Sequence, residues 1–365
     1  MFRWKLPTSL PTPAAVQIPN MNTTIQPTVM SAYGLCHDEE QRLLKTQNQR
    51  NDQPLIHIRI LGWMFVYNLG TQMLIKLSEA VTSCRGVDAT YDWLGEFYLN
   101  YWIRPFRIRG RTPDSSRTSR SSLEADSEVV DLAALLKAPQ VDHSGAKALA
   151  LERDGYCCVL TGIVDCNSVR DPWVGAMYKK EKKSWMYTEC AHIFSKSTDE
   201  RLDDESKKLY AGRAWAVLES FGYGDMLGEV DGSDGHCREN ILTLETNCHH
   251  AFDELRLWLE PIEPDNPDSH SYHIRTHYYS HPSLPASVTF TDHARPEYRG
   301  QIPLPSKRYL RVHAACCSVA AMSGAREYLD KVMRDQESID VLSTDGGSPD
   351  VAVNAVWKAF YSISE

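Results

Sequence analysis

Apolar residues between positions 54 and 84 recur at spacings of three and four, which is the period of a helix with one buried face. The repeating positions are Leu55, Ile58, Leu61, Phe65, Leu69, Met73 and Leu77. A second apolar segment, at 91–106, is crowded with aromatic residues. We predict that the two segments pack as a helical hairpin, forming an N-terminal module at 54–106 in which the aromatic side chains fill a core.

Polar segments separate this module from its neighbours. Residues 1–53 are rich in Pro, Thr, Gln and Asn, and are predicted to form a disordered tail. Residues 107–125 form an Arg/Ser-rich linker, and residues 339–365 combine a Ser/Asp/Gly linker with a short terminal helix. The folded parts of the chain are therefore expected between these segments.

The region 126–262 mixes helical patterns with short apolar runs typical of strands. A turn is predicted at Thr161-Gly162, and a strand at 185–193. The polar stretch 198–230 is predicted to be helical. A later strand at 240–244 leads into a helix for which Thr246 or Asn247 is the expected cap.

The region 263–338 is predicted to be a hairpin with a helical extension. A strand at 255–259 is expected to pair with one at 272–275, across a loop rich in Pro and Asp. A helix over 308–321 is expected to break at Ser323-Gly324. Taken together, the elements predict an α+β protein with helical N-terminal and C-terminal flanks.

Charge and cysteine content narrow the functional classes. The net charge of −9 argues against a uniformly basic coat, so nucleic-acid binding has to use local patches. Ten irregularly spaced cysteines do not make a disulfide scaffold, and they suit a reducing compartment. Residues 1–30 show no secretory signal, and the most apolar stretch, 59–76, is shorter than a membrane span. An intracellular protein, nuclear or cytoplasmic and without a membrane partner, is expected.

Two local basic clusters stand out against this acidic background. The linker contains arginines among Ser, Thr, Gly and Pro, and a lysine run precedes the strand at 185–193. Each is either a solvated flexible segment or a surface that contacts phosphates. The candidate contact residues are Arg107, Arg109, Arg111, Lys179, Lys180, Lys182 and Lys183.

The strongest chemical pattern lies between Glu189 and Asp253. It opens with Glu-Cys-Ala-His-Ile at 189–193 and closes with the segment 240–253, which contains Asn240 and His249. Asp253 follows His249 by four residues, so the two side chains share one face of a helix. An imidazole and a carboxylate in this relation can hold one cation.

These residues resemble the HNH nuclease motif, in the form common in fungal proteins. The matching positions are Ala191, His192, Ile193, Asn240, Leu244, His249, Phe252 and Asp253. The opening segment of such domains resembles Arg-Asp-Gly-Tyr-Cys-Cys-Val-Leu-Thr-Gly at 153–162. The resemblance covers about 151–260 and implies a ββα-metal nuclease core within 126–262.

The resemblance also implies roles for individual residues. His192 would be the general base, and His249 and Asp253 would hold a divalent metal ion. Asn240 would fix the loop and the orientation of His192. Glu189 matches an acidic position of colicin-type members. There it would orient His192, or it would hydrogen-bond to a metal ligand without binding the ion itself. His250 is expected to contact nucleic acid or to lie on the surface.

This chain departs from the family pattern at two places that bear on the expected metal sites. Many relatives bind a structural zinc through two Cys-x-x-Cys pairs, but the four positions here are Cys158, Thr161, Glu245 and Cys248, so we expect no such zinc. Many relatives also place a further metal ligand directly before the base, where this chain has Ala191. With two ligands left from the motif, magnesium or manganese is favoured, and zinc is possible.

The predicted function is therefore a metal-dependent HNH endonuclease that hydrolyses phosphodiester bonds, with DNA favoured over RNA. Retention of His192, His249 and Asp253 favours the enzyme. Ala191 and the acidic net charge favour an inactive HNH-fold module that binds nucleic acid or protein. A structural protein with a helical N-terminal partner surface is the third alternative.

The arginine-rich linker yields a test of its own. Deleting residues 107–122 is expected to weaken nucleic-acid binding and to flatten its salt dependence. Fewer phosphate contacts remain, so binding releases fewer counterions. The measurement is the slope of log affinity against log salt concentration for both chains. An unchanged slope would show that the segment is only a tether.

Overall fold

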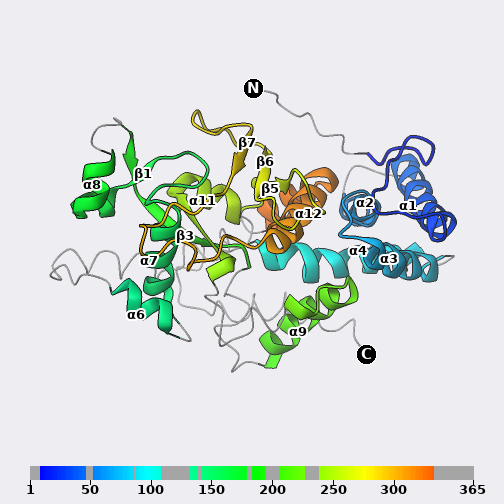
Figure 1. The fold of residues 1–365 in the computed structure, drawn as a ribbon. Helices are drawn as coiled ribbons and strands as arrows, with labels where there is room; N and C mark the ends of the chain where they lie inside the picture. Colours follow the sequence, from blue (N-terminus) through cyan, green and yellow to red (C-terminus); the bar gives the residue numbers. More distant parts are fainter. Residues whose placement is uncertain are drawn as a thin grey trace.

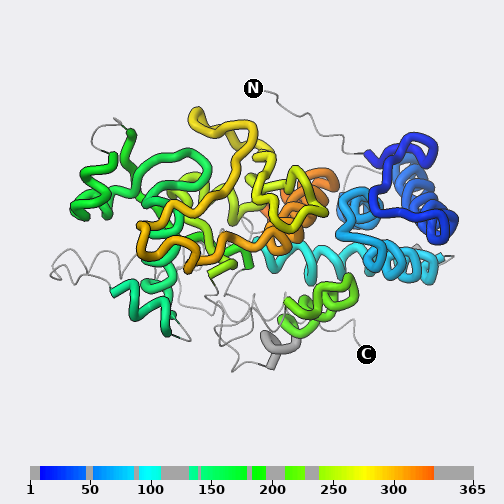
Figure 2. The backbone as a smooth tube through the Cα atoms, in the orientation of Figure 1, coloured from blue at the N-terminus to red at the C-terminus, as the bar shows by residue number. Residues whose placement is uncertain are grey.

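The structure is a computed structural model, and it describes residues 9–46, 52–85, 88–107, 131–138, 141–178, 183–194, 205–226 and 238–332. Figures 1 and 2 show an elongated molecule, with the first helices at one end and the segment around α8 at the other. Most of the predicted Arg/Ser-rich linker and the whole of 339–365 lie outside the described residues.

Helices form the N-terminal end of the molecule (Figure 1). They are α1 (Gln26–Thr46), α2 (Gln53–Val66), α3 (Thr71–Ser83) and α4 (Asp88–Tyr98), followed by the short turns η1 (Leu99–Ile103) and η2 (Arg104–Phe106). Helix α2 packs against α1 and α4, and its residues Ile58, Leu61 and Phe65 are buried. The predicted helical hairpin therefore exists as the pair α2 and α4.

The periodicity over 54–84 predicted one continuous helix, but the structure divides it. Gly70 has a φ of +143°, a conformation that is open to glycine and strained for other residues. The Asn68 side chain donates to the Phe65 carbonyl at 2.8 Å and accepts from the Gly70 N–H at 3.0 Å, which ends α2. The apolar period continues across the break because α2 and α3 both face the same core.

The prediction of a disordered tail at 1–53 is wrong for residues 9–46. Helix α1 buries Val29, Tyr33 and Cys36, a stripe with the spacing of one helix face. The buried Glu40 carboxylate pairs with Arg59 at 2.6 Å and accepts from the Leu10 N–H. The polar composition of the whole tail concealed this stripe, because composition averages over both faces of a helix.

The central region contains two small sheets and several helices. Its first elements are α6 (Leu132–Lys137), α7 (His143–Arg153), β1 (Val164–Asp165), η3 (Cys166–Arg170), α8 (Pro172–Tyr178) and β2 (Trp185–Met186). They are followed by β3 (Thr188–His192), α9 (Glu205–Ser220), η5 (Arg238–Asn240), β4 (Ile241–Glu245) and α11 (Thr246–Asp253). Strands β1 and β2 pair in parallel, and β3 and β4 pair antiparallel from Thr188–Glu245 to His192–Ile241.

The C-terminal region confirms the predicted strand pair. Strand β5 (Leu257–Pro261) pairs with β6 (Ser271–Thr276), which also pairs with β7 (Ser287–Thr289), a strand that the pattern did not predict. Helix α12 (Lys307–Ser323) follows, and Gly324 ends it in the left-handed conformation, with a φ of +83°. Almost every residue of α12 is buried, because it packs between α2 and β5.

The predicted modules share one hydrophobic core. A single cluster of buried side chains runs from Leu10 through Phe65, Leu244 and Val319 to Leu329. Asp330, beyond α12, binds Arg107 from the N-terminal helices and Arg256 from the loop after α11. The helical flanks are therefore part of the same folded unit as the central region.

His313 of α12 is fully enclosed in this core, and it generates a prediction on stability. Its ring stacks on Phe252 of α11 at 3.9 Å between centroids, and burial lowers the pKa of His313 from 6.5 to about 3. As the pH falls below 6.5, the unfolded chain binds a proton that the folded chain does not, so the free energy of unfolding decreases. At pH 5 we expect a loss of about 2 kcal/mol from this residue alone.

The variant His313→Phe keeps the stacked ring and removes the proton uptake. Urea unfolding at pH 7 and at pH 5 measures the change for each protein, so that any constant effect of the substitution cancels. The wild type is expected to lose about 2 kcal/mol more than the variant between the two pH values. Equal losses in both proteins would contradict the buried, neutral state of His313.

Candidate active site

The two faces of the β3–β4 ladder carry different groups. Side chains alternate along a strand, so Cys190 and His192 lie on one face, and Glu189 and Ala191 on the other. Cys190 packs with Ala146 and Ala150, which places α7 on the His192 face. Ala191 belongs to the main core together with Phe252 of α11. Helices α7 and α11 therefore cover opposite faces of the ladder.

The start of α11 is set by a carboxylate. Glu245 caps the helix and accepts hydrogen bonds from the backbone N–H groups of Asn247 at 3.1 Å and Cys248 at 2.9 Å. The prediction that Thr246 or Asn247 caps this helix is wrong, because both residues already lie inside it. The Glu245 side chain extends from the end of β4 to the first turn of α11, and it thereby fixes the angle between the strand and the helix.

His249 lies between two carboxylates on the α11 face. Its Nδ1 is 2.6 Å from Glu189 Oε2, and its Nε2 is 3.4 Å from Asp253 Oδ2. The side chains of His249 and Asp253 are each 18% exposed, and that of Glu189 is 42% exposed. The structure thus brings together two predicted metal ligands and Glu189, which was expected near His192.

Burial and charge determine the protonation of this group. Burial by itself would lower the pKa of His249, but the hydrogen bond to Glu189 and the charge of Asp253 raise it overall. Burial raises the pKa of Asp253 to about 6, although the nearby His249 opposes the shift. The Oδ1 atom of Asp253 is buried and has no hydrogen-bond partner among the residues that the structure describes. A buried carboxylate in this state gains stability from a cation.

Glu189, His249 and Asp253 have the chemistry of metal ligands, but their arrangement leaves no open position between them. Two carboxylates and one imidazole are ligands that magnesium, manganese and zinc all accept. Within the described residues, however, no group of three or more His, Cys, Asp or Glu side chains is arranged to hold a metal ion. His249 contacts both Glu189 and Asp253, so its ring occupies the space between the carboxylates.

Asn240 holds the chain directly after His192. Its side-chain oxygen accepts from the Phe194 N–H at 2.8 Å, and its amide nitrogen donates to the Phe194 carbonyl at 3.0 Å. The Asn240 carbonyl accepts a further hydrogen bond from the Ile193 N–H at 2.8 Å. The Asn240 side chain is fully buried, so these bonds are shielded from water.

The structure adds His143, which the sequence pattern did not single out. Its ring lies against that of His192, with 5.8 Å between centroids and 28° between planes. His143 is the first residue of α7, and Asp142 caps that helix. A helix was expected before the motif, but periodicity does not reveal which of its residues meets a strand that is distant in sequence.

The predicted nucleic-acid contacts have mixed outcomes. Arg107 is buried at 9% exposure and paired with Asp330, so its assignment as a surface contact is wrong. Lys183 lies with its Nζ 4.6 Å from the centre of the Tyr178 ring. The His250 side chain is 73% exposed and lies 3.3 Å from Glu254. The remaining candidates, Arg109, Arg111, Lys179, Lys180 and Lys182, lie outside the described residues.

The burial of Arg107 changes the design of the linker experiment. Because Arg107 joins the N-terminal helices to Asp330, a deletion that begins at 107 would also disturb the core. The deletion has to begin at 108.

The four positions at which many relatives bind a structural zinc meet in space. Cys158 and Cys248 are hydrogen-bonding partners, and Thr161 donates to Cys158 as well. Burial acts against a thiolate, but these hydrogen bonds lower the pKa of Cys158 to about 6. The Tyr279 hydroxyl lies 3.6 Å from Cys248 Sγ. Hydrogen bonds among side chains therefore join the turn at 158–162 to α11.

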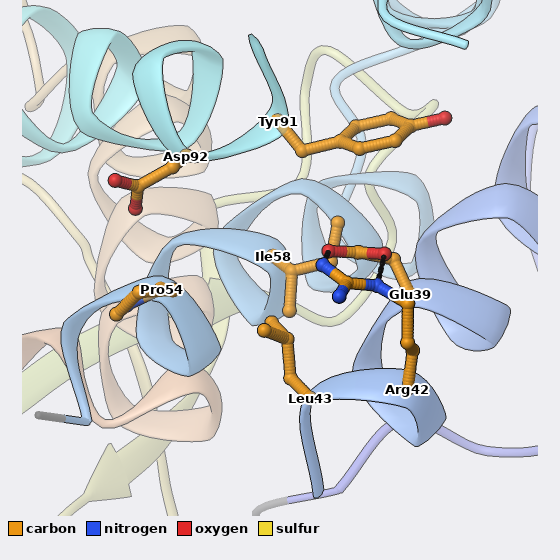
Figure 3. Close-up of a pocket in the computed structure, with 7 residues that line it drawn as sticks. All are labelled: Glu39, Arg42, Leu43, Pro54, Ile58, Tyr91 and Asp92. Atoms are coloured by element: carbon orange, nitrogen blue, oxygen red, sulfur yellow. Dashed lines mark hydrogen bonds and ion pairs between the residues drawn. The ribbon is translucent and has the colours of Figure 1, made fainter. Parts of the chain in front are cut away.

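A pocket elsewhere on the molecule is separate from this site. It lies between α1, α2 and α4, and Figure 3 shows Arg42 paired with Glu39 along the α1 side of the pocket. Its remaining lining residues are Leu43, Pro54, Ile58, Tyr91 and Asp92. It contains no residue of the motif, and it does not bear on the chemistry of β3 and α11.

Comparisons with known proteins agree with the geometry. A family model described as HNH endonuclease matches residues 158–260, which includes β3, β4 and α11 but not α7 or α12. The comparison with curated proteins and that with solved structures each gave no match. Among the described helices, none has both the length and the apolar character that crossing a membrane requires. The chain therefore has an α+β architecture and contains an HNH nuclease domain over residues 158–260.

Proposed function

We propose that the protein is an endonuclease that hydrolyses phosphodiester bonds with the help of a divalent metal ion, and that DNA is its substrate in preference to RNA. One observation carries the proposal. Within the segment that matches HNH endonucleases, Glu189, His249 and Asp253 converge on one face of the ladder, and one buried oxygen of Asp253 finds no partner in the described part of the chain.

In this proposal Asp253 and the Nε2 atom of His249, which lies on the Asp253 side of the ring, hold the metal ion. Glu189 accepts a hydrogen bond from Nδ1 on the other side of the ring and so orients His249 as a ligand. Magnesium and manganese bind with few protein ligands and keep several waters, so two protein ligands favour them over zinc. When bound, the ion would offset charge on the phosphoryl and leaving oxygens as a Lewis acid.

His192 is the proposed general base. A ring nitrogen of the neutral imidazole accepts a proton from the attacking water, a role that histidine fills more often than other side chains. The three hydrogen bonds between Asn240 and residues 193–194 support this role, because they hold the strand end that carries the ring. A base held in place in this way loses little freedom when the substrate binds.

The second candidate is a module that kept the HNH fold and lost catalysis. Ala191 in the ligand position and the net charge of −9 favour it. The close contact of His249 with both carboxylates also favours it, because a protonated imidazole satisfies them without a metal ion. Cleavage of plasmid DNA and of RNA by the full chain, with magnesium, manganese and zinc each supplied, decides between the two.

The roles of the two histidines can be separated by substitution. His192→Ala is expected to lower cleavage about 10²-fold to 10⁴-fold and to leave metal binding intact, because a base is not a ligand. His249→Ala is expected to lose both cleavage and metal binding. Calorimetric titration with manganese beside a plasmid-cleavage assay measures the two properties. His273→Ala, on β6, is the matched control. Loss of metal binding in His192→Ala would reverse the assignment.

The role of Glu189 gives an independent test. Glu189→Gln keeps the size of the side chain and removes its charge, and it is expected to raise the metal concentration for half-maximal cleavage about 10-fold to 100-fold. Glu260→Gln is the control, because Glu260 is similarly exposed, at 41%, and pairs with Arg275 on β5 and β6. Metal titration curves that coincide for the wild type and Glu189→Gln would exclude Glu189 from the metal site.

A further inference from the structure

A second imidazole lies beside the proposed base at the junction of α7 and β3. The rings of His143 and His192 are 5.8 Å apart between centroids, with 28° between their planes. His143 is exposed, and His192 is half-buried at the end of its strand. Both rings are thus accessible to a substrate, in contrast to His313, which is enclosed in the core.

The side of α7 that faces β3 is basic. Lys147 lies one turn after His143 on the same side of the helix, and its Nζ donates to the Thr188 carbonyl of β3 at 3.1 Å. His143 is the first residue of α7, where the helix dipole favours an anion. The Asp142 carboxylate is directed to the Gly145 N–H at 2.7 Å. His143 and the start of α7 therefore lie at the His192 end of β3, whereas Lys147 is held at its Thr188 end.

The separation of the two rings suits a phosphate group. A hydrogen bond from an imidazole N–H to a charged oxygen is about 2.7–2.9 Å long. The centroids of His143 and His192 are 5.8 Å apart, which leaves room for one phosphate at their edges. The metal-ligand candidates lie on the α11 side of the ladder, so the metal ion and His143 would approach the phosphate from different sides.

We propose that His143 is a catalytic residue of the nuclease, a role that rests on the proposed function. Its imidazole N–H donates a hydrogen bond to a non-bridging oxygen of the phosphate that is attacked beside His192. The bond strengthens as negative charge builds up on that oxygen in the transition state. His143 lies outside residues 158–260, so the catalytic centre extends beyond the segment that matches the family.

Three substitutions separate hydrogen bonding from packing. His143→Ala removes the ring, His143→Phe keeps a flat ring without a donor, and His143→Asn keeps a donor on a shorter side chain. We expect kcat/KM to fall about 10-fold to 100-fold for the Ala and Phe variants, with partial recovery for Asn. His273→Ala is the control, and thermal unfolding checks that each variant is folded.

Sulfur substitution of the substrate identifies the contact. Oligonucleotides with a single Rp or Sp phosphorothioate at the cleaved position are compared with the unmodified substrate. In the wild type, one isomer is expected to react more slowly, because sulfur is a poor hydrogen-bond acceptor. In His143→Ala that difference is expected to shrink. The same sulfur effect in both proteins would show that His143 acts only on structure, and would overturn the proposal.

The outcomes also separate this proposal from the proposed function. If the wild type cleaves and all three His143 variants cleave equally well, the role of His143 fails and the nuclease function stands. If the wild type does not cleave with any ion, the nuclease function fails. Binding of a labelled oligonucleotide in EDTA then tests the phosphate contact. Weaker binding by the Ala and Phe variants supports it, and unchanged binding overturns it.

Discussion

The buried guanidinium of Arg153 connects the parts on which the site depends. It is fully enclosed and bonds to Asp154 and to the carbonyls of Arg238 at 2.9 Å, Ile241 at 2.8 Å and Pro303 at 3.2 Å. Asp154 in turn accepts from the Thr243 N–H at 3.1 Å. One charged pair at the end of α7 thereby fixes β4, the loop before it and the C-terminal segment. Removing either partner would leave an uncompensated buried charge, which is far more costly than losing a surface pair.

Strand β4, which Arg153 and Asp154 hold in place, in turn positions the residues of the candidate site. The strand begins beside Asn240, which holds the chain after His192, and it ends at Glu245, which caps α11. The antiparallel register then sets Glu189 opposite Leu244 and within reach of His249. A shift of one residue would exchange the faces of β3 and separate Glu189 from α11. The register of the ladder thus decides that Glu189 faces α11 and that His192 faces α7.

The helical flanks support this ladder from outside the family segment. Helix α12 packs against α2 and β5, and its His313 stacks on Phe252, the neighbour of Asp253. Asp330 binds arginines from the N-terminal helices and from the loop after α11. Helix α7 brings His143 to the strand end. The helices that flank the HNH segment therefore position its strands and helix.

Local patterns in the sequence determined much of this protein. The i, i+4 spacing of His249 and Asp253, the pairing of β5 with β6 and the break at Gly324 follow from rules that act over a few residues. Only the tertiary structure decided that residues 26–46 form a helix in the core, that Arg107 is buried, and that Glu189 contacts His249 while His143 meets His192. Those contacts join residues that are distant in sequence. They depend on the strand register and on which helix faces which strand, and the period of a single segment carries no information about its partner.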